Sequence, residues 1–117
     1  MYAGGLIGDA SRAHVSDCSA DVTVTGRCIS GGFIGNVFQG SYKNCTAKGS
    51  VSGGWSTGGF AGCVFESDAS VEIEHCASYG NVEANNWDTG GFSGTNTEGN
   101  IQNCNAAGIY LATGAAV

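Results

Sequence analysis

The chain has 117 residues, of which 21 are glycine and none is proline. Each glycine inside a helix costs about 1 kcal/mol relative to alanine, so this composition excludes a helical bundle, and the lack of proline excludes collagen. Ten acidic and four basic residues give a net charge of −6, which disfavours nucleic acid and anionic membrane surfaces as partners. No apolar run approaches the roughly 18 residues that span a bilayer, so we expect no membrane insertion.

Four similar segments follow one another along the chain. They begin with GGLIG at Gly4, GGFIG at Gly31, GGFAG at Gly58 and GGFSG at Gly90. Such self-similarity at a nearly fixed period is typical of repeat proteins. We predict a single repeat domain over residues 1–117, a fragment of a larger chain. Its repeats are 4–30, 31–57, 58–89 and 90–117.

Alignment of the repeats places similar residues in the same column. Three such columns are Leu6, Phe33, Phe60 and Phe92; Val15, Tyr42, Ile73 and Ile101; and Val24, Val51, Val82 and Tyr110. Small and apolar columns separated by glycines predict short strands with alternate side chains facing inward. A repeat of about 27 residues cannot bury its apolar face alone and must stack on its copies. We predict an all-β fold, a right-handed parallel β-solenoid (β-helix) of about four coils.

These residues resemble the GLUG repeat, a short bacterial motif built on Gly-Leu-any-Gly with a following Asn-Cys block. The first halves read GLIG, GFIG, GFAG and GFSG, and the second halves contain DC, NC, HC and NC. Phenylalanine therefore replaces leucine in three copies. The resemblance covers nearly the whole chain and implies an extracellular β-helical stalk or binding region of a secreted or cell-surface bacterial protein of the adhesin type. It implies no catalytic residue.

The cysteines form the most regular polar feature. Four of the six occupy one column: Cys18, Cys45, Cys76 and Cys104. A linear column cannot place four sulfurs tetrahedrally around zinc, and no C-x-x-C spacing occurs, so we expect no structural zinc. Disulfides between adjacent rungs are sterically possible, but we favour an inward stack of reduced thiols. Cys63 aligns with the polar residues Asp9, Asn36 and Thr95, and we expect it to be the most exposed cysteine.

Acidic residues cluster near positions 66–74, where the third repeat is four residues longer than the others; they are Glu66, Asp68, Glu72 and Glu74. A solvated loop is the interpretation we favour. The alternative is a cation site or the acid/base pair of a glycan-degrading β-helix. Neither a DxDxDG-type loop nor a calcium-binding nonapeptide occurs. We therefore expect no catalytic residue, no metal and no cofactor, with Ca²⁺ at this cluster as the alternative.

The corners of the predicted coils carry the candidate contact residues. Trp55 and Trp87 each precede a glycine pair, and Asn85, Asn86 and Asp88 surround the second tryptophan. Aromatic rings beside amides suit contact with sugars or peptides. His75 shares a column with Asp17, Asn44 and Asn103, which predicts a polar side chain that hydrogen-bonds a corner backbone.

These observations favour a non-enzymatic, structural and adhesive segment. It would present a surface for a host or matrix glycan or protein and would stack on further repeats of its parent chain. The alternative is a fragment of a glycan-degrading β-helix enzyme that uses the acidic cluster near 66–74.

Overall fold

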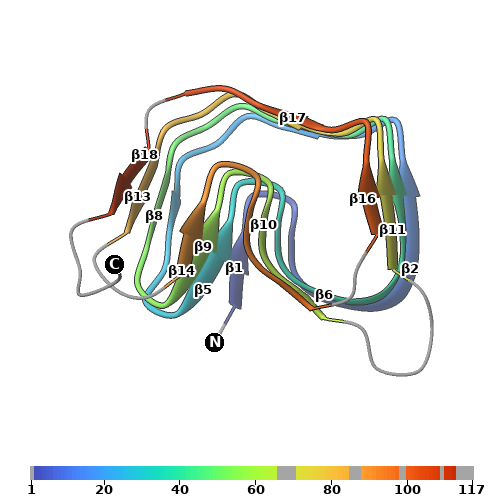
Figure 1. The fold of residues 1–117 in the computed structure, drawn as a ribbon, viewed down its shortest axis with the longest axis horizontal. Coiled ribbons are helices and arrows are strands. Elements are labelled where there is room, and N and C mark those ends of the chain that lie inside the picture. Colours follow the sequence, from blue (N-terminus) through green and yellow to red (C-terminus); the bar gives the residue numbers. More distant parts are fainter. Residues whose placement is uncertain (1, 66–70, 85–87, 98–99, 109, 113–117) are drawn as a thin grey trace.

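The computed structural model describes residues 2–65, 71–84, 88–97, 100–108 and 110–112, and every regular element among them is a β-strand. Strands of successive repeats pair in parallel, so the repeats stack as a β-solenoid (Figure 1). The predicted all-β class and the parallel β-solenoid are confirmed. The molecule measures 33 × 27 × 22 Å along its principal axes.

Three sheets take one strand from each repeat. The first contains, in spatial order, β1 (Tyr2–Gly4), β5 (Ile29–Gly31), β9 (Ser56–Gly58) and β14 (Asp88–Gly90). Another contains β3 (Ser19–Ala20), β7 (Thr46–Ala47), β12 (Ala77–Ser78) and β17 (Asn105–Ala106). A third contains β4 (Val24–Thr25), β8 (Val51–Gly53), β13 (Val82–Ala84) and β18 (Tyr110–Ala112).

The remaining sheet is built on two long strands. It contains β2 (Ile7–Ser16), β6 (Ile34–Lys43), β10 (Ala61–Phe65), β11 (Val71–Glu74), β15 (Ser93–Thr97) and β16 (Asn100–Gln102). The first two repeats cross this sheet in one continuous strand, whereas the third and fourth cross it in two shorter ones. In each of the other three sheets, four strands are stacked, so three intervals separate the first strand from the last. The solenoid therefore makes about three turns, whereas the sequence predicts about four coils.

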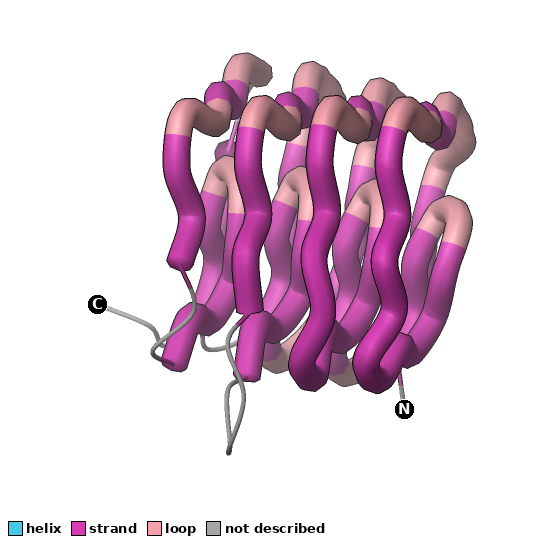
Figure 2. Tube along the Cα trace, turned by 90° about the vertical axis from the view of Figure 1, so that its right-hand side faces the viewer, coloured by secondary structure: helices cyan, strands magenta, loops and turns pink. Residues whose placement is uncertain are grey.

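The path of one coil is visible in Figure 1, where corresponding strands lie one behind another. The sheet of β17 runs along the top, β16, β11 and β2 form the right side, and β18, β13 and β8 form the left side. Strands β9 and β10 are joined by a turn that lies inside this outline. Figure 2 shows the same coils side by side.

Strand register confirms the columns predicted from the sequence. Val15 pairs with Tyr42, Tyr42 with Ile73, and Ile73 with Ile101. Inside the coil, the ring of Phe60 stacks on Phe33 and on Phe92, with centroids 4.8 Å apart in both pairs. Buried side chains that surround these rings form the core cluster, which includes Ile34, Val37, Val64, Val71 and Cys45.

The glycines of the GGFxG motif are required by close backbone contact. A Cβ atom on Gly58 would collide with the carbonyl oxygen of Ala61, and one on Gly59 would collide with that of Gly91 in the next coil. Side chains at these positions would push apart the arms of the internal turn or the coils themselves. Among the glycines that the structure describes, positive φ occurs only at Gly40 and Gly108.

Left-handed backbone occurs instead at a polar column. Asp17, Asn44, His75 and Asn103 have φ between 52° and 55°, each directly before a cysteine of the ladder. Asn and Asp tolerate this conformation better than most other residues that carry a side chain. The left-handed backbone therefore accounts for the polar residue types in this column, which the sequence predicts to be a corner.

Candidate functional site

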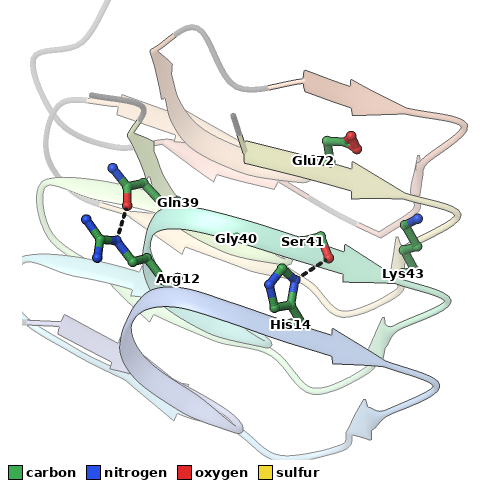
Figure 3. A pocket seen from close by; sticks show the side chains of 7 residues that line it. All are labelled: Arg12, His14, Gln39, Gly40, Ser41, Lys43 and Glu72. Atoms are coloured by element: carbon green, nitrogen blue, oxygen red, sulfur yellow. Dashed lines mark hydrogen bonds between the residues drawn. The ribbon is translucent and has the colours of Figure 1, made fainter. Parts of the chain in front are cut away.

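A groove of about 490 Å³ lies on the outer face of the long-stranded sheet. Its lining residues come from three successive coils: Arg12, His14, Gln39, Gly40, Ser41, Lys43 and Glu72 (Figure 3). Tyr42 points into the core from the middle of this segment and is fully buried. Because side chains alternate along a strand, Ser41 and Lys43 face outward.

The groove lies where the long strands bend. Arg12 and Gln39 occupy equivalent positions in β2 and β6, between the register pairs Ser11–Phe38 and Ala13–Gly40. Both have left-handed backbone, with φ of 59° and 71°. This conformation is uncommon for a residue with a long side chain, and strain of this kind concentrates at functional sites.

The two residues at the bend also bond to each other through their side chains. Arg12 donates a hydrogen bond from Nε to Oε1 of Gln39 over 2.8 Å (Figure 3). Gln39 is only 5% exposed, whereas Arg12 is exposed. A buried amide therefore orients an exposed guanidinium at one end of the groove.

Polar residues of neighbouring coils continue along the groove in register. Nδ1 of His14 lies 3.1 Å from Oγ of Ser41, and Ser41 pairs in register with Glu72 on β11. Lys43 is flanked by Ser16 on one side and by Glu74 on the other. In the part of the chain that the structure describes, the groove thus combines cationic donors with one carboxylate and neutral polar groups, a mixture suited to a polar ligand.

Of the predicted acidic cluster, the structure describes Glu72 and Glu74, both half-buried on β11. Glu72 lines the groove, and Glu74 is in register with Lys43. Glu66 and Asp68 lie outside the described residues. Phe65 pairs with Phe38, and Val71 pairs with Gly40. In the aligned sequences, the extra residues of the third repeat therefore fall at the position that Gln39 occupies in the second repeat.

The corner tryptophan Trp55 is 48% exposed between β8 and β9. Its carbonyl oxygen accepts a 2.7 Å hydrogen bond from the backbone N–H of Asp88. Asp88 is exposed, and its Oδ2 accepts a 3.3 Å hydrogen bond from Thr95. The structure thus brings two of the predicted contact residues together on this corner. The other three, Trp87, Asn85 and Asn86, lie outside the described residues.

The cysteine column packs inward, as predicted. Cys45 and Cys76 are buried, Cys18 and Cys104 are half-buried, and all six cysteines are free thiols. Burial raises the pKa of Cys76 from its ordinary value of 9.0 to about 12, and it also raises the pKa of Cys45 and Cys104. These thiols stay protonated at neutral pH, which makes them poor nucleophiles.

The prediction for Cys63 is wrong in one respect. Its register with Asn36 and Thr95 is as expected, but the side chain is half-buried, as are those of three other cysteines. The reason is the internal turn, which packs β10 against the sheet of β9. Burial and the nearby Asp88 carboxylate both raise the pKa of the Cys63 thiol.

The sequence did not predict a functional role for four residues of the groove: Arg12, Gln39, Ser41 and Lys43. The signal that was available is the spacing of 27 residues, which aligns Arg12 with Gln39 and His14 with Ser41. Nothing in the sequence marks the left-handed bend, because Arg and Gln are not residues that favour it.

Residues 1–25 match the family model described as the GLUG motif. This match agrees with the resemblance to the GLUG repeat seen in the sequence, and the motif and the β-solenoid fold together fit a repeat segment of the surface type. A search of curated proteins and of solved structures found no significant match.

The described part of the chain contains no group of three or more His, Cys, Asp or Glu side chains arranged to hold a metal ion. It also contains no helix long and apolar enough to cross a membrane.

Proposed function

We propose that this chain is a structural and adhesive segment of a bacterial secreted or cell-surface protein and that it is not an enzyme. In this proposal it presents a binding surface to a host or matrix glycan or protein. The observation that carries the proposal is the outer groove, where a buried Gln39 holds the exposed Arg12 by a 2.8 Å hydrogen bond. An oriented polar group at the surface of a rigid scaffold is what a binding site requires.

Packing of the interior supports the same assignment. The rings of Phe33, Phe60 and Phe92 and the thiols of the cysteine column fill the coil. The polar side chains that a ligand can reach therefore lie on the outer face. A stack of similar coils makes a rigid support for them, because each coil is hydrogen-bonded along its strands to the next.

Trp55 supplies a second contact surface on the same scaffold. Its ring is about half exposed at a corner that also carries Asp88. Tryptophan is enriched at binding surfaces because one side chain combines a large apolar face with a polar N–H. We assign Trp55 and Asp88 to ligand contact together with the predicted residues Trp87, Asn85 and Asn86.

Further repeats of the same kind are the expected structural partners. The sheets end at strands β1, β3 and β4 of the first repeat, which pair on one side only. Leu6 is 49% exposed there, whereas its equivalents Phe33 and Phe60 are fully buried. Unpaired strand edges beside exposed apolar side chains favour stacking on another coil.

The experiment that tests the proposal compares binding with turnover. The chain is incubated with a panel of immobilised and soluble polysaccharides, and both retention and new reducing ends are measured. We expect retention without new reducing ends, and we expect Trp55→Ala to weaken it. Reducing ends that disappear in a Glu72→Gln, Glu74→Gln variant would instead establish the glycan-degrading alternative.

A further inference from the structure

The groove concentrates positive charge on an acidic protein. The chain carries a net charge of −6 and only four Lys and Arg residues. Two of these, Arg12 and Lys43, line the groove together with His14, and among the lining residues that the structure describes Glu72 is the acidic one. Lys43 also stands in register with Glu74, which offsets part of its charge. Arg12 is therefore the principal cationic group available to a ligand.

The contact with Gln39 determines how Arg12 can bind. A guanidinium presents five N–H donors in a planar fork and pairs with carboxylates through two parallel hydrogen bonds. Nε of Arg12 is committed to Oε1 of Gln39 at 2.8 Å. A carboxylate is then expected to bind end-on, across the two Nη groups. The side chain pays little further ordering entropy, because the buried amide and the left-handed backbone already hold it.

Other groups along the groove select for hydroxyls. Glu72 is a hydrogen-bond acceptor, and Ser41 and His14 can both donate and accept. A polyanion would meet the Glu72 carboxylate and the overall negative charge of the chain repeatedly, so a ligand with one anionic group fits better than a chain of them. The volume of about 490 Å³ is within the usual range for sites that hold a small ligand.

We infer that the groove binds an oligosaccharide that carries a single carboxylate, which pairs with Arg12. Glu72 accepts hydrogen bonds from neighbouring sugar hydroxyls, and Ser41 can accept or donate them. This inference rests on the proposed adhesive function and names the ligand class. In this arrangement Gln39 is a positioning residue that acts through Arg12.

The probes are sialyllactose, its methyl ester and lactose, titrated into the whole chain by calorimetry or NMR. The ester keeps the shape of the sugar and removes its charge. We expect sialyllactose to bind at least tenfold more tightly than the ester or lactose. Arg12→Gln is expected to abolish this preference, and Gln39→Leu to reduce it while the charge remains.

Arg27→Gln is the matched control, because it removes the same charge from an exposed arginine outside the groove. Equal losses in Arg27→Gln and Arg12→Gln would overturn the inference, since general electrostatics would then explain binding. Groove-dependent binding of the ester as tight as that of sialyllactose would overturn the ligand class and leave the adhesive function standing. Absence of binding to all three sugars would overturn the inference, and the adhesive function would still be decided by retention on other glycans and proteins.

Discussion

The rings of Phe33 and Phe60 lie 4.8 Å apart at an angle of 4°, which is about the spacing of hydrogen-bonded strands. Phe92 continues the stack from the other side of Phe60 at the same distance. The spacing between hydrogen-bonded strands of neighbouring coils thus determines the spacing between the stacked rings.

The middle ring should contribute most to stability. Phe60→Leu removes two ring contacts, whereas Phe92→Leu removes one, and each aromatic pair contributes about 0.5–1.5 kcal/mol beyond burial. We expect Phe60→Leu to lower the free energy of unfolding by about 2 kcal/mol and Phe92→Leu by about half of that. Urea titration followed by circular dichroism measures both variants. Equal effects would contradict this prediction, because Phe60 exceeds Phe92 both in ring contacts and in burial.

The hydroxyl group of Tyr42 lies fully buried, and among the described residues it has no hydrogen-bond partner. Leaving such a group unpaired costs about 1–3 kcal/mol. We therefore expect Tyr42→Phe to raise the free energy of unfolding by roughly 1 kcal/mol. Tyr79→Phe, at an exposed tyrosine, is the matched control and should leave stability unchanged. A loss of stability in Tyr42→Phe would mean that the hydroxyl is hydrogen-bonded.

His75 occupies a left-handed corner that its equivalents fill with Asp or Asn. Asparagine adopts this conformation more readily than histidine or a β-branched residue. We expect His75→Asn to stabilise the fold by several tenths of a kcal/mol and Asn44→Val to destabilise it by about 1–2 kcal/mol. Thermal unfolding of both variants tests the assignment. A stabilising effect of valine would contradict the left-handed backbone.

The buried thiol of Cys76 predicts how stability depends on pH. Its pKa rises from 9.0 to about 12 on folding because burial disfavours the thiolate. The unfolded chain ionises first as pH rises, so it binds fewer protons than the folded chain, and stability falls between pH 9 and about 12. Tyr42, whose pKa rises from 10.0 to about 12, acts in the same direction from pH 10.

Urea midpoints at several pH values between 8 and 11 measure this decline. Cys76→Ala should flatten it even though the variant is less stable overall, and adding Tyr42→Phe should flatten it further. A slope that neither substitution changes would show that other groups titrate on unfolding.

Much of this fold can be predicted from the sequence, because the repeats supply their own alignment. The column of Val15, Tyr42, Ile73 and Ile101 is found as strand register, and the cysteine column is found inside the coil. Repetition reveals these features since each rung must bury the same side of its strands.

The candidate site is less predictable for a physical reason. It depends on the left-handed bend at Arg12 and Gln39, and neither residue type favours that conformation. The half-buried Cys63 was missed for a related reason: column alignment gives the register of a strand but not the internal turn that covers it. Both features arise from how the coil closes in cross-section, whereas the repeat pattern reports how coils stack.

The central claim is that the outer groove is the main binding surface, and one comparison of charge-matched variants tests it most directly. Arg12→Gln with Lys43→Gln removes two positive charges from the groove, and Arg27→Gln with Lys48→Gln removes two exposed positive charges from outside it. Retention on immobilised host or matrix glycans and proteins is measured for both double variants, with circular dichroism as the check on folding. We predict that the groove variant loses at least tenfold in affinity while the other retains it. Equal retention of the two folded variants would contradict the claim.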